Sequence, residues 1–62
     1  MANYYLDTID GNDTNNGTAT GTPVKTTEKA VSLATQDGDI IQEKFEESRW
    51  SAVFIKGGLN NG

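Results

Sequence analysis

The stretch from Gly11 to Asp39, GNDTNNGTATGTPVKTTEKAVSLATQDGD, decides the fold of this chain. Its first part, residues 11–21, consists almost entirely of Gly, Asn, Asp and Thr. Asn and Asp side chains bond their own backbone and tolerate left-handed conformations, as Gly does freely, and Asn16-Gly17 is a strong turn signal. We expect an ordered, turn-rich loop here. The alternative is disorder, since the composition is polar and of low complexity.

A short helix is expected after this loop. Pro23 fixes the chain, and the helix is predicted over residues 27–35 with Thr26 or Thr27 as its N-cap. Its apolar stripe is expected to consist of Ala30, Val31 and Ala34, with Leu33 at the margin. Because about nine helical residues are not stable alone in water, this stripe must cover another part of the chain. Asp37-Gly38 is predicted to end the helix in a turn.

Strands are expected on both sides of this stretch, at residues 4–6, 39–42 and 50–55. The charged residues 42–49 are compatible with a strand edge, a loop or a helical turn. Glu43 and Glu47 would repel each other in a helix, which favours strand or loop. The predicted fold class is α+β, mostly β, with short strands and one short helix. We expect one small domain over residues 1–62, in which residues 42–62 form a strand-rich part or an extended arm.

Composition limits how such a chain can be stabilised. It has 62 residues, of which 34% are hydrophobic, and it contains neither Cys nor His. Disulfides are therefore impossible, and we expect no zinc site of the usual kind. Small chains that lack these features commonly rely on partners, so oligomerisation or docking on a larger protein is the remaining common way to stabilise this chain.

Charge and hydropathy exclude several classes of partner. The net charge is −4, which argues against nucleic acid and against anionic membrane surfaces. The N-terminal Met-Ala-Asn-Tyr-Tyr has neither a basic nor an apolar region, so we expect no signal peptide. No apolar run approaches the length of a membrane span. We interpret the sequons at residues 12–14 and 16–18 as accidents of composition.

The order of these elements resembles the N-terminal segment of right-handed parallel β-helix proteins, which include polysaccharide lyases and bacteriophage tailspikes. The resemblance rests on the strand at residues 4–7, Gly-x-Asp-x-Asn-x-Gly-Thr at 11–18, Thr-Pro-x-Lys-Thr at 22–26, Ala30-Val31, and Gly-Asp-x-Ile at 38–41. It covers residues 4–41, roughly two-thirds of the chain.

The resemblance implies a cap, in which the helix plugs the open end of the coil and residues 38–41 start the first rung. Each rung of such a coil buries its face only against a neighbour. The chain departs from the pattern at Thr27, where Leu or Ile is usual, and in the charged residues 42–49. It also stops where the coil should begin, although at least three repeats are expected for a stable solenoid. The catalytic residues of the family lie on later rungs, so none carries over.

Three patterns could carry chemistry, and each has a structural explanation. Asp10, Asn12, Asp13 and Asn15 could supply oxygen ligands to calcium. An EF-hand register from Asp10 fails, because it places Asn15 where Gly is needed and Gly21 where Glu is needed. Asp37 and Asp39 are interpreted as a helix-to-strand turn rather than as an acid–base pair. Trp50 with Arg49 and Glu47 fits a sugar-stacking patch, but a Trp that opens an apolar strand is more typical of a core or an interface.

These observations predict a non-enzymatic structural or assembly protein without catalytic, cofactor-binding or metal-binding residues. The resemblance implies a bacteriophage virion component, such as a capsid decoration, fibre or tail-associated protein, that is cytoplasmic before assembly. Its expected partners are copies of itself, for instance in a trimer, or a larger virion protein. The predicted interface consists of Ile40, Ile41, Trp50, Val53, Phe54 and Ile55.

Two alternatives remain open at this point. The chain could be the N-terminal piece of a carbohydrate-active β-helix tailspike or polysaccharide lyase, and only this alternative has carbohydrate as a partner. It could also be a largely disordered peptide that orders on a partner.

Overall fold

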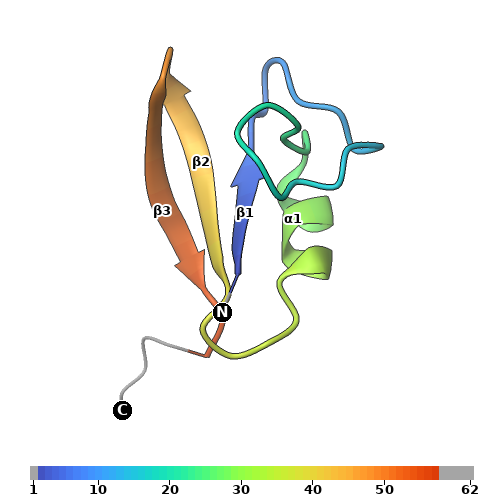
Figure 1. Ribbon diagram of the computed structural model, residues 1–62, viewed down its shortest axis with the longest axis vertical. Coiled ribbons are helices and arrows are strands. Elements are labelled where there is room, and N and C mark those ends of the chain that lie inside the picture. Colours follow the sequence, from blue (N-terminus) through green and yellow to red (C-terminus); the bar gives the residue numbers. More distant parts are fainter. Residues whose placement is uncertain (1, 58–62) are drawn as a thin grey trace.

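The computed structural model describes residues 2–57 of the chain. Its elements are β1 (Asn3–Leu6), α1 (Thr27–Leu33), β2 (Ile40–Glu46) and β3 (Arg49–Ile55). The strands form one sheet in the order β1-β2-β3, in which β1 and β2 are parallel and β2 and β3 antiparallel. Helix α1 lies on the β1 side of the sheet (Figure 1). The chain is a small α+β domain with a three-stranded mixed sheet and one short helix, which confirms the predicted fold class at this level.

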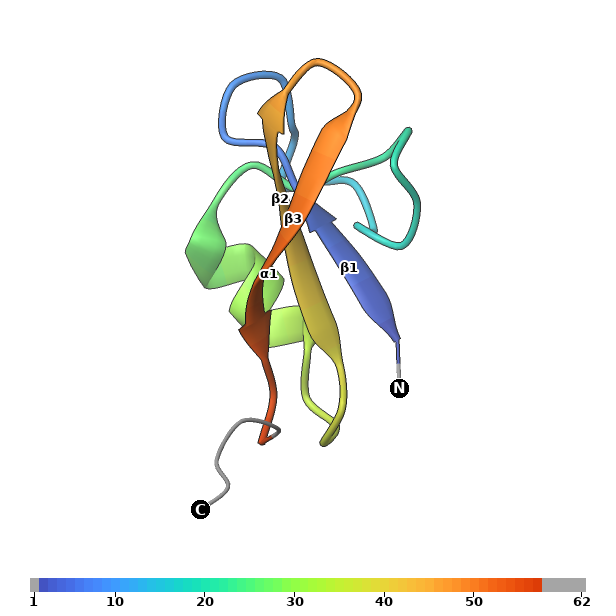
Figure 2. The ribbon, with the colours of Figure 1, turned by 90° about the vertical axis from the view of Figure 1, so that its left-hand side faces the viewer.

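The turn-rich loop closes the free edge of β1. The Tyr5 N–H donates to the Gly17 carbonyl at 2.8 Å, the Val24 N–H donates to the Tyr5 carbonyl at 3.0 Å, and the Asp7 N–H donates to the Val24 carbonyl at 2.8 Å. Leu6 and Val24 form a parallel bridge. The loop lies beside β1 in both ribbon views (Figures 1 and 2). It therefore takes the place of a further strand, and β1 has hydrogen-bonded neighbours on both sides.

Helix α1 begins as the sequence predicts and ends two residues early. Thr26 is the N-cap, and its Oγ1 accepts the Lys29 N–H at 3.2 Å. Ala34 has φ −85° and ψ 82°, which terminates the helix. The prediction for Val31 is wrong, because this side chain is 42% exposed, whereas Leu33 packs against the core. The packed stripe therefore follows the i, i+3, i+4 spacing of residues 30, 33 and 34.

The core lies between β1, β2 and α1. Its buried residues are Leu6, Val24, Ala30, Ala34 and Ile41, with Tyr4 and Leu33 packed against them. Ile41 pairs with Tyr4 across the parallel ladder and is 1% exposed. Ile41 is one of the residues predicted for an uncovered interface, and this prediction is wrong: Ile41 is a core residue, because strand alternation turns it to the helix side.

The charged residues 42–49 continue β2 and then turn, in agreement with the interpretation as strand or loop. Glu47 and Ser48 form a tight connection between Glu46 and Arg49, which are paired. Ser48 has φ +69°, in the left-handed region. The described part of the predicted arm is thus an antiparallel hairpin, while residues 58–62 lie outside the described residues.

Candidate interaction surface

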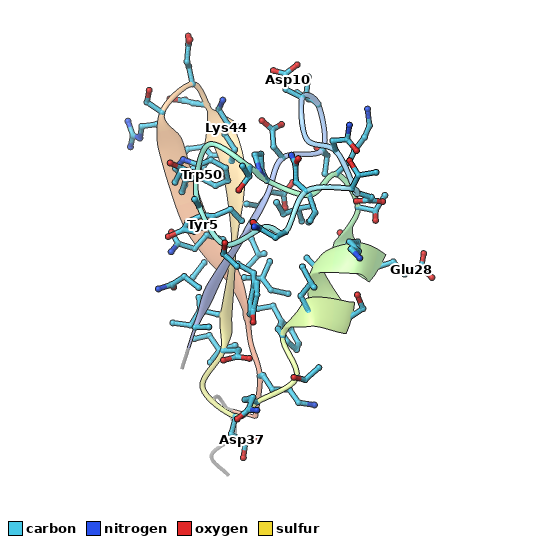
Figure 3. All side chains as sticks on the ribbon, turned by 45° about the vertical axis from the view of Figure 1, so that its right-hand side comes forward. Tyr5, Asp10, Glu28, Asp37, Lys44 and Trp50 are labelled. Carbon is cyan, nitrogen blue, oxygen red and sulfur yellow. The ribbon has the colours of Figure 1, made fainter. Side chains whose placement is uncertain are left out.

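One face of the sheet points away from the helix and carries an aromatic pair. Strand alternation turns Tyr5 and Gln42 to this face, and Gln42 Nε2 donates to Asn3 Oδ1 at 3.3 Å. The rings of Tyr5 and Trp50 meet edge to face, with centroids 5.3 Å apart and an interplanar angle of 81°. Figure 3 shows the two side chains next to each other. Trp50 is half-buried in this contact, so it is anchored within its own chain.

The residues predicted for an interface lie on β3 and on the adjoining end of β2. Ile40 pairs with Ile55, and both are half-buried. Phe54 pairs with Ile41, so it is on the helix side, where it is still 37% exposed. The register shifts by one residue between Ile41 and Gln42, so that Val53 has no partner on β2, and Val53 is 54% exposed.

We call the set Ile40, Trp50, Val53, Phe54 and Ile55 the β3 surface. Its members occupy both faces of the hairpin and do not form one flat patch.

The β3 surface is uncovered because the rest of the described chain gathers around β1. The contacts of α1 with the sheet fall mainly on β1, and Figure 1 shows β3 on the side of the sheet away from α1. Among the described residues β3 pairs with β2 alone. Residues 50–55 carry no charge, no proline and no lysine, which are the usual devices that protect an edge strand from pairing. The protection that β3 has consists of the bulge at Val53 and the charge of Arg49 at its first residue.

A second apolar feature lies at the tip of the molecule and was not identified from the sequence. Ile9 is 78% exposed and Phe45 is 57% exposed. Both line an open groove of about 350 Å³, together with Asp7, Asp10, Lys44, Glu46 and Glu47. The Arg49 guanidinium carbon lies 5.5 Å from the centroid of the Phe45 ring. The only signal in the sequence was that each is a lone apolar residue among polar ones.

Asp7 and Asp13 hold loop segments in place through backbone hydrogen bonds. Asp7 Oδ1 accepts the N–H of Asp10 at 2.9 Å and that of Ile9 at 3.0 Å, and Asp7 Oδ2 lies 3.7 Å from Lys44 Nζ. The Asp10 N–H bond is the main cause that holds the pKa of Asp7 below its usual value. The Ile9 N–H and the Lys44 charge act in the same direction, against a partial cost of burial.

Asp13 joins the loop to the start of α1. Its Oδ1 accepts the N–H groups of Lys25 at 2.8 Å and Thr26 at 3.0 Å, and its Oδ2 accepts the Thr26 hydroxyl at 2.8 Å. The Lys25 N–H bond is the first cause that lowers the pKa of Asp13, and the Thr26 hydroxyl and N–H add to it, while desolvation opposes it. The calcium-ligand candidates Asp13 and Asn15 are therefore engaged in local bonds, since Asn15 Nδ2 also donates to the Pro23 carbonyl at 2.8 Å.

Asp39 joins the helix-to-strand connection to the residue that precedes β1. It is 2% exposed, and its Oδ1 accepts the Ala2 N–H at 2.9 Å while its Oδ2 accepts the Gln36 N–H at 3.0 Å. Gly38 takes φ +92°, a conformation that favours glycine. These bonds support the interpretation of residues 37–39 as a turn.

In residues 2–57, no three acidic side chains are grouped closely enough to hold a metal ion. Every buried side-chain nitrogen or oxygen of the same residues has a hydrogen-bond partner. The seven-residue α1, the helix in the described part of the chain, is too short to cross a membrane. No family model matches the chain, and neither the curated proteins nor the solved structures contain a significant match to it.

Proposed function

We propose that this chain is a non-enzymatic assembly module that associates with further copies of itself through the β3 surface. The observation that carries the proposal is the uncovered edge strand β3, on which Val53 is 54% and Phe54 37% exposed. An edge strand with exposed apolar side chains and no charge over residues 50–55 favours pairing with another chain. The small core, with five buried hydrophobic residues in the described part of the chain, gives a physical reason to gain stability from a partner.

The resemblance of residues 4–41 to β-helix caps supports a role in a bacteriophage virion, on the capsid or the tail. In the fold, this segment comprises β1, the loop, α1 and the start of β2, and a cap of this kind covers the end of a larger assembly. A larger virion protein would then be the second kind of partner, and the virion the place of action.

The proposal is tested by comparing Val53→Ser with Val31→Ser. Both side chains are exposed to a similar extent, at 54% and 42%, but Val31 lies on α1 away from the β3 surface. Burial of one valine contributes about 1.5 kcal/mol, so Val53→Ser should weaken self-association by about tenfold per site, and Val31→Ser should leave it unchanged. Sedimentation equilibrium measures the self-association constants of both variants. Equal association constants for the two variants would overturn the β3 surface as the interface.

A second candidate function is carbohydrate binding, as in the N-terminal piece of a β-helix tailspike or lyase. The observation in its favour is the Tyr5–Trp50 pair beside an open groove of about 400 Å³ lined by Thr20, Lys44, Glu47, Ser48 and Trp50. Aromatic rings with hydroxyl, amino and carboxylate neighbours suit stacking on sugars. Since Trp50 is the single tryptophan of the chain, its fluorescence during titration with bacterial oligosaccharides distinguishes the two candidates.

A further inference from the structure

Asn16 holds its side-chain oxygen in a cluster of hydrogen bonds at the surface of the loop. Asn16 Oδ1 accepts the Thr18 N–H at 3.1 Å, the Thr18 hydroxyl at 2.9 Å and the Thr22 hydroxyl at 3.1 Å. The residue itself is exposed, while the following Gly17 is buried and has φ +70°. The structure thus fixes both members of an Asn-Gly dipeptide, a pair whose side-chain amide is chemically labile in a free peptide.

We propose that Asn16 is a deamidation site that the folded loop keeps closed and that local opening exposes. In the reaction, the Gly17 backbone nitrogen loses its proton and attacks Cγ of Asn16. The new carbon–nitrogen bond closes a succinimide, and the side-chain nitrogen leaves as ammonia. Water then opens the ring and leaves either aspartate or isoaspartate at position 16.

The fold opposes the first step at the backbone of Gly17. The Gly17 N–H donates to the Thr22 carbonyl at 2.9 Å, and the Gly17 carbonyl accepts the Tyr5 N–H at 2.8 Å. The nitrogen that must be deprotonated is therefore bonded, and the next peptide group, which carries the Gly17 carbonyl, is held against β1. A Cβ at Gly17 would lie 3.2 Å from Val24 Cγ1 and 3.3 Å from Leu33 Cδ1, so the backbone at Gly17 has little room to move. The attack consequently requires the loop to open first.

The two products have different consequences for the loop. Aspartate presents the same acceptor oxygens to Thr18 and Thr22, so the turn can remain. Isoaspartate inserts a methylene group into the backbone ahead of Gly17, which moves the carbonyl that accepts the Tyr5 N–H. Only the isoaspartate form should therefore weaken the edge contact between the loop and β1.

The experiment measures deamidation at Asn16 by mass spectrometry of proteolytic fragments, in native buffer and in concentrated urea. We expect the reaction to be at least about tenfold slower in native buffer, since the native rate is limited by local opening. Equal rates in the two solvents would overturn the proposal. This comparison uses the unmodified chain and does not depend on whether any variant folds.

Matched variants identify the bonds that keep the site closed. Thr18→Val and Thr22→Val each remove one hydroxyl donor to Asn16, and each should speed the native reaction by about fivefold without affecting the rate in urea. Thr14→Val is the control, because its hydroxyl makes the same type of bond to Asn12 Oδ1 at 2.7 Å and should leave the rate at Asn16 unchanged. If Thr14→Val accelerates deamidation at Asn16 as much as Thr18→Val does, the local bonds at Asn16 are not the cause.

Discussion

At the scale of single residues, Asp7 and Asp13 act as fixed acceptors for backbone N–H groups that no helix or strand satisfies. Unpaired N–H groups are costly when water cannot reach them, and a short carboxylate side chain is well suited to bond them. In a loop without regular secondary structure, these two residues therefore define the backbone path. Their ionised forms make the bonds, which links the stability of the loop to pH.

We expect the chain to lose stability in acid because of these two carboxylates. Their folded-state pKa values lie below the usual value of 3.8. Because their pKa is depressed in the folded state, these carboxylates contribute fully to the unfolding free energy at any pH above their pKa in the unfolded chain. This contribution is lost as the pH falls through their pKa values in the folded chain, so the unfolding free energy should begin to decline near pH 4. Urea unfolding followed by circular dichroism between about pH 7 and pH 2 measures it.

The control for this prediction is a comparison of two Asp→Asn variants. Asp13→Asn should flatten the decline, because the amide does not titrate. Asp10→Asn, at an exposed side chain in the same loop region, should retain it. If the unfolding free energy of Asp13→Asn falls in acid as steeply as that of the unmodified chain, the bonds of Asp13 are not the cause of the pH dependence.

Burial of individual residues was the least predictable property from the sequence. Ile41 and Ile40 are adjacent and chemically identical, and only the register with β1 decides which of them faces the helix. Likewise Val31 and Leu33 both border the alanines of α1, but only Leu33 reaches the core. A one-residue change in register or helix phase reverses such assignments, and composition contains no information on it.

At the scale of elements, the β2–β3 hairpin has an unusual connection. Tight two-residue hairpin turns prefer Asn-Gly, Asp-Gly or Gly-containing pairs, because one or both residues take positive φ. Here the pair is Glu47-Ser48, and Ser48 has φ +69°. The sequence therefore lacked the usual turn signal, which explains why residues 42–49 remained open between strand and loop. The β1 strand, the loop and the start of α1 had conventional signals and were predicted correctly.

Ser48→Gly should stabilise the hairpin, because glycine adopts positive φ without the steric cost of a Cβ, which is about 1 kcal/mol. We expect the unfolding free energy to rise by up to about 1 kcal/mol. Ser51→Gly, inside β3, is the matched control and should lower it by about 0.5–1 kcal/mol. Thermal unfolding followed by circular dichroism compares the two variants. A lower unfolding free energy for Ser48→Gly would contradict the inference that Ser48 is strained at this turn.

At the scale of the whole molecule, the sheet is closed on one edge and open on the other. The loop pairs with β1, whereas β3 has a neighbour on one side only among the described residues. The apolar run at 50–55, from which most of the predicted interface residues come, forms most of the open edge strand β3, and its role as an interface stays a prediction. The tip groove could not be predicted, since Ile9 and Phe45 lie far apart in the sequence and line the same groove only as a result of the fold.

The core is small enough that one truncation should unfold the chain. Leu6→Ala removes a fully buried side chain, and such changes cost about 2–5 kcal/mol. This is comparable to the whole stability that a core of this size supplies. We expect Leu6→Ala to lose its cooperative thermal transition, while Val31→Ala, on the exposed side of α1, should change the unfolding free energy by less than about 0.5 kcal/mol. A cooperative transition in Leu6→Ala at the original temperature would contradict the assigned core.

The measurement that tests the central claim most directly is the solution mass of the purified chain by light scattering over a concentration series, with circular dichroism on the same samples. Self-association through β3 predicts a folded chain whose mass rises with concentration to a defined multiple of the 6.7 kDa monomer. A folded monomer at every concentration would contradict self-association.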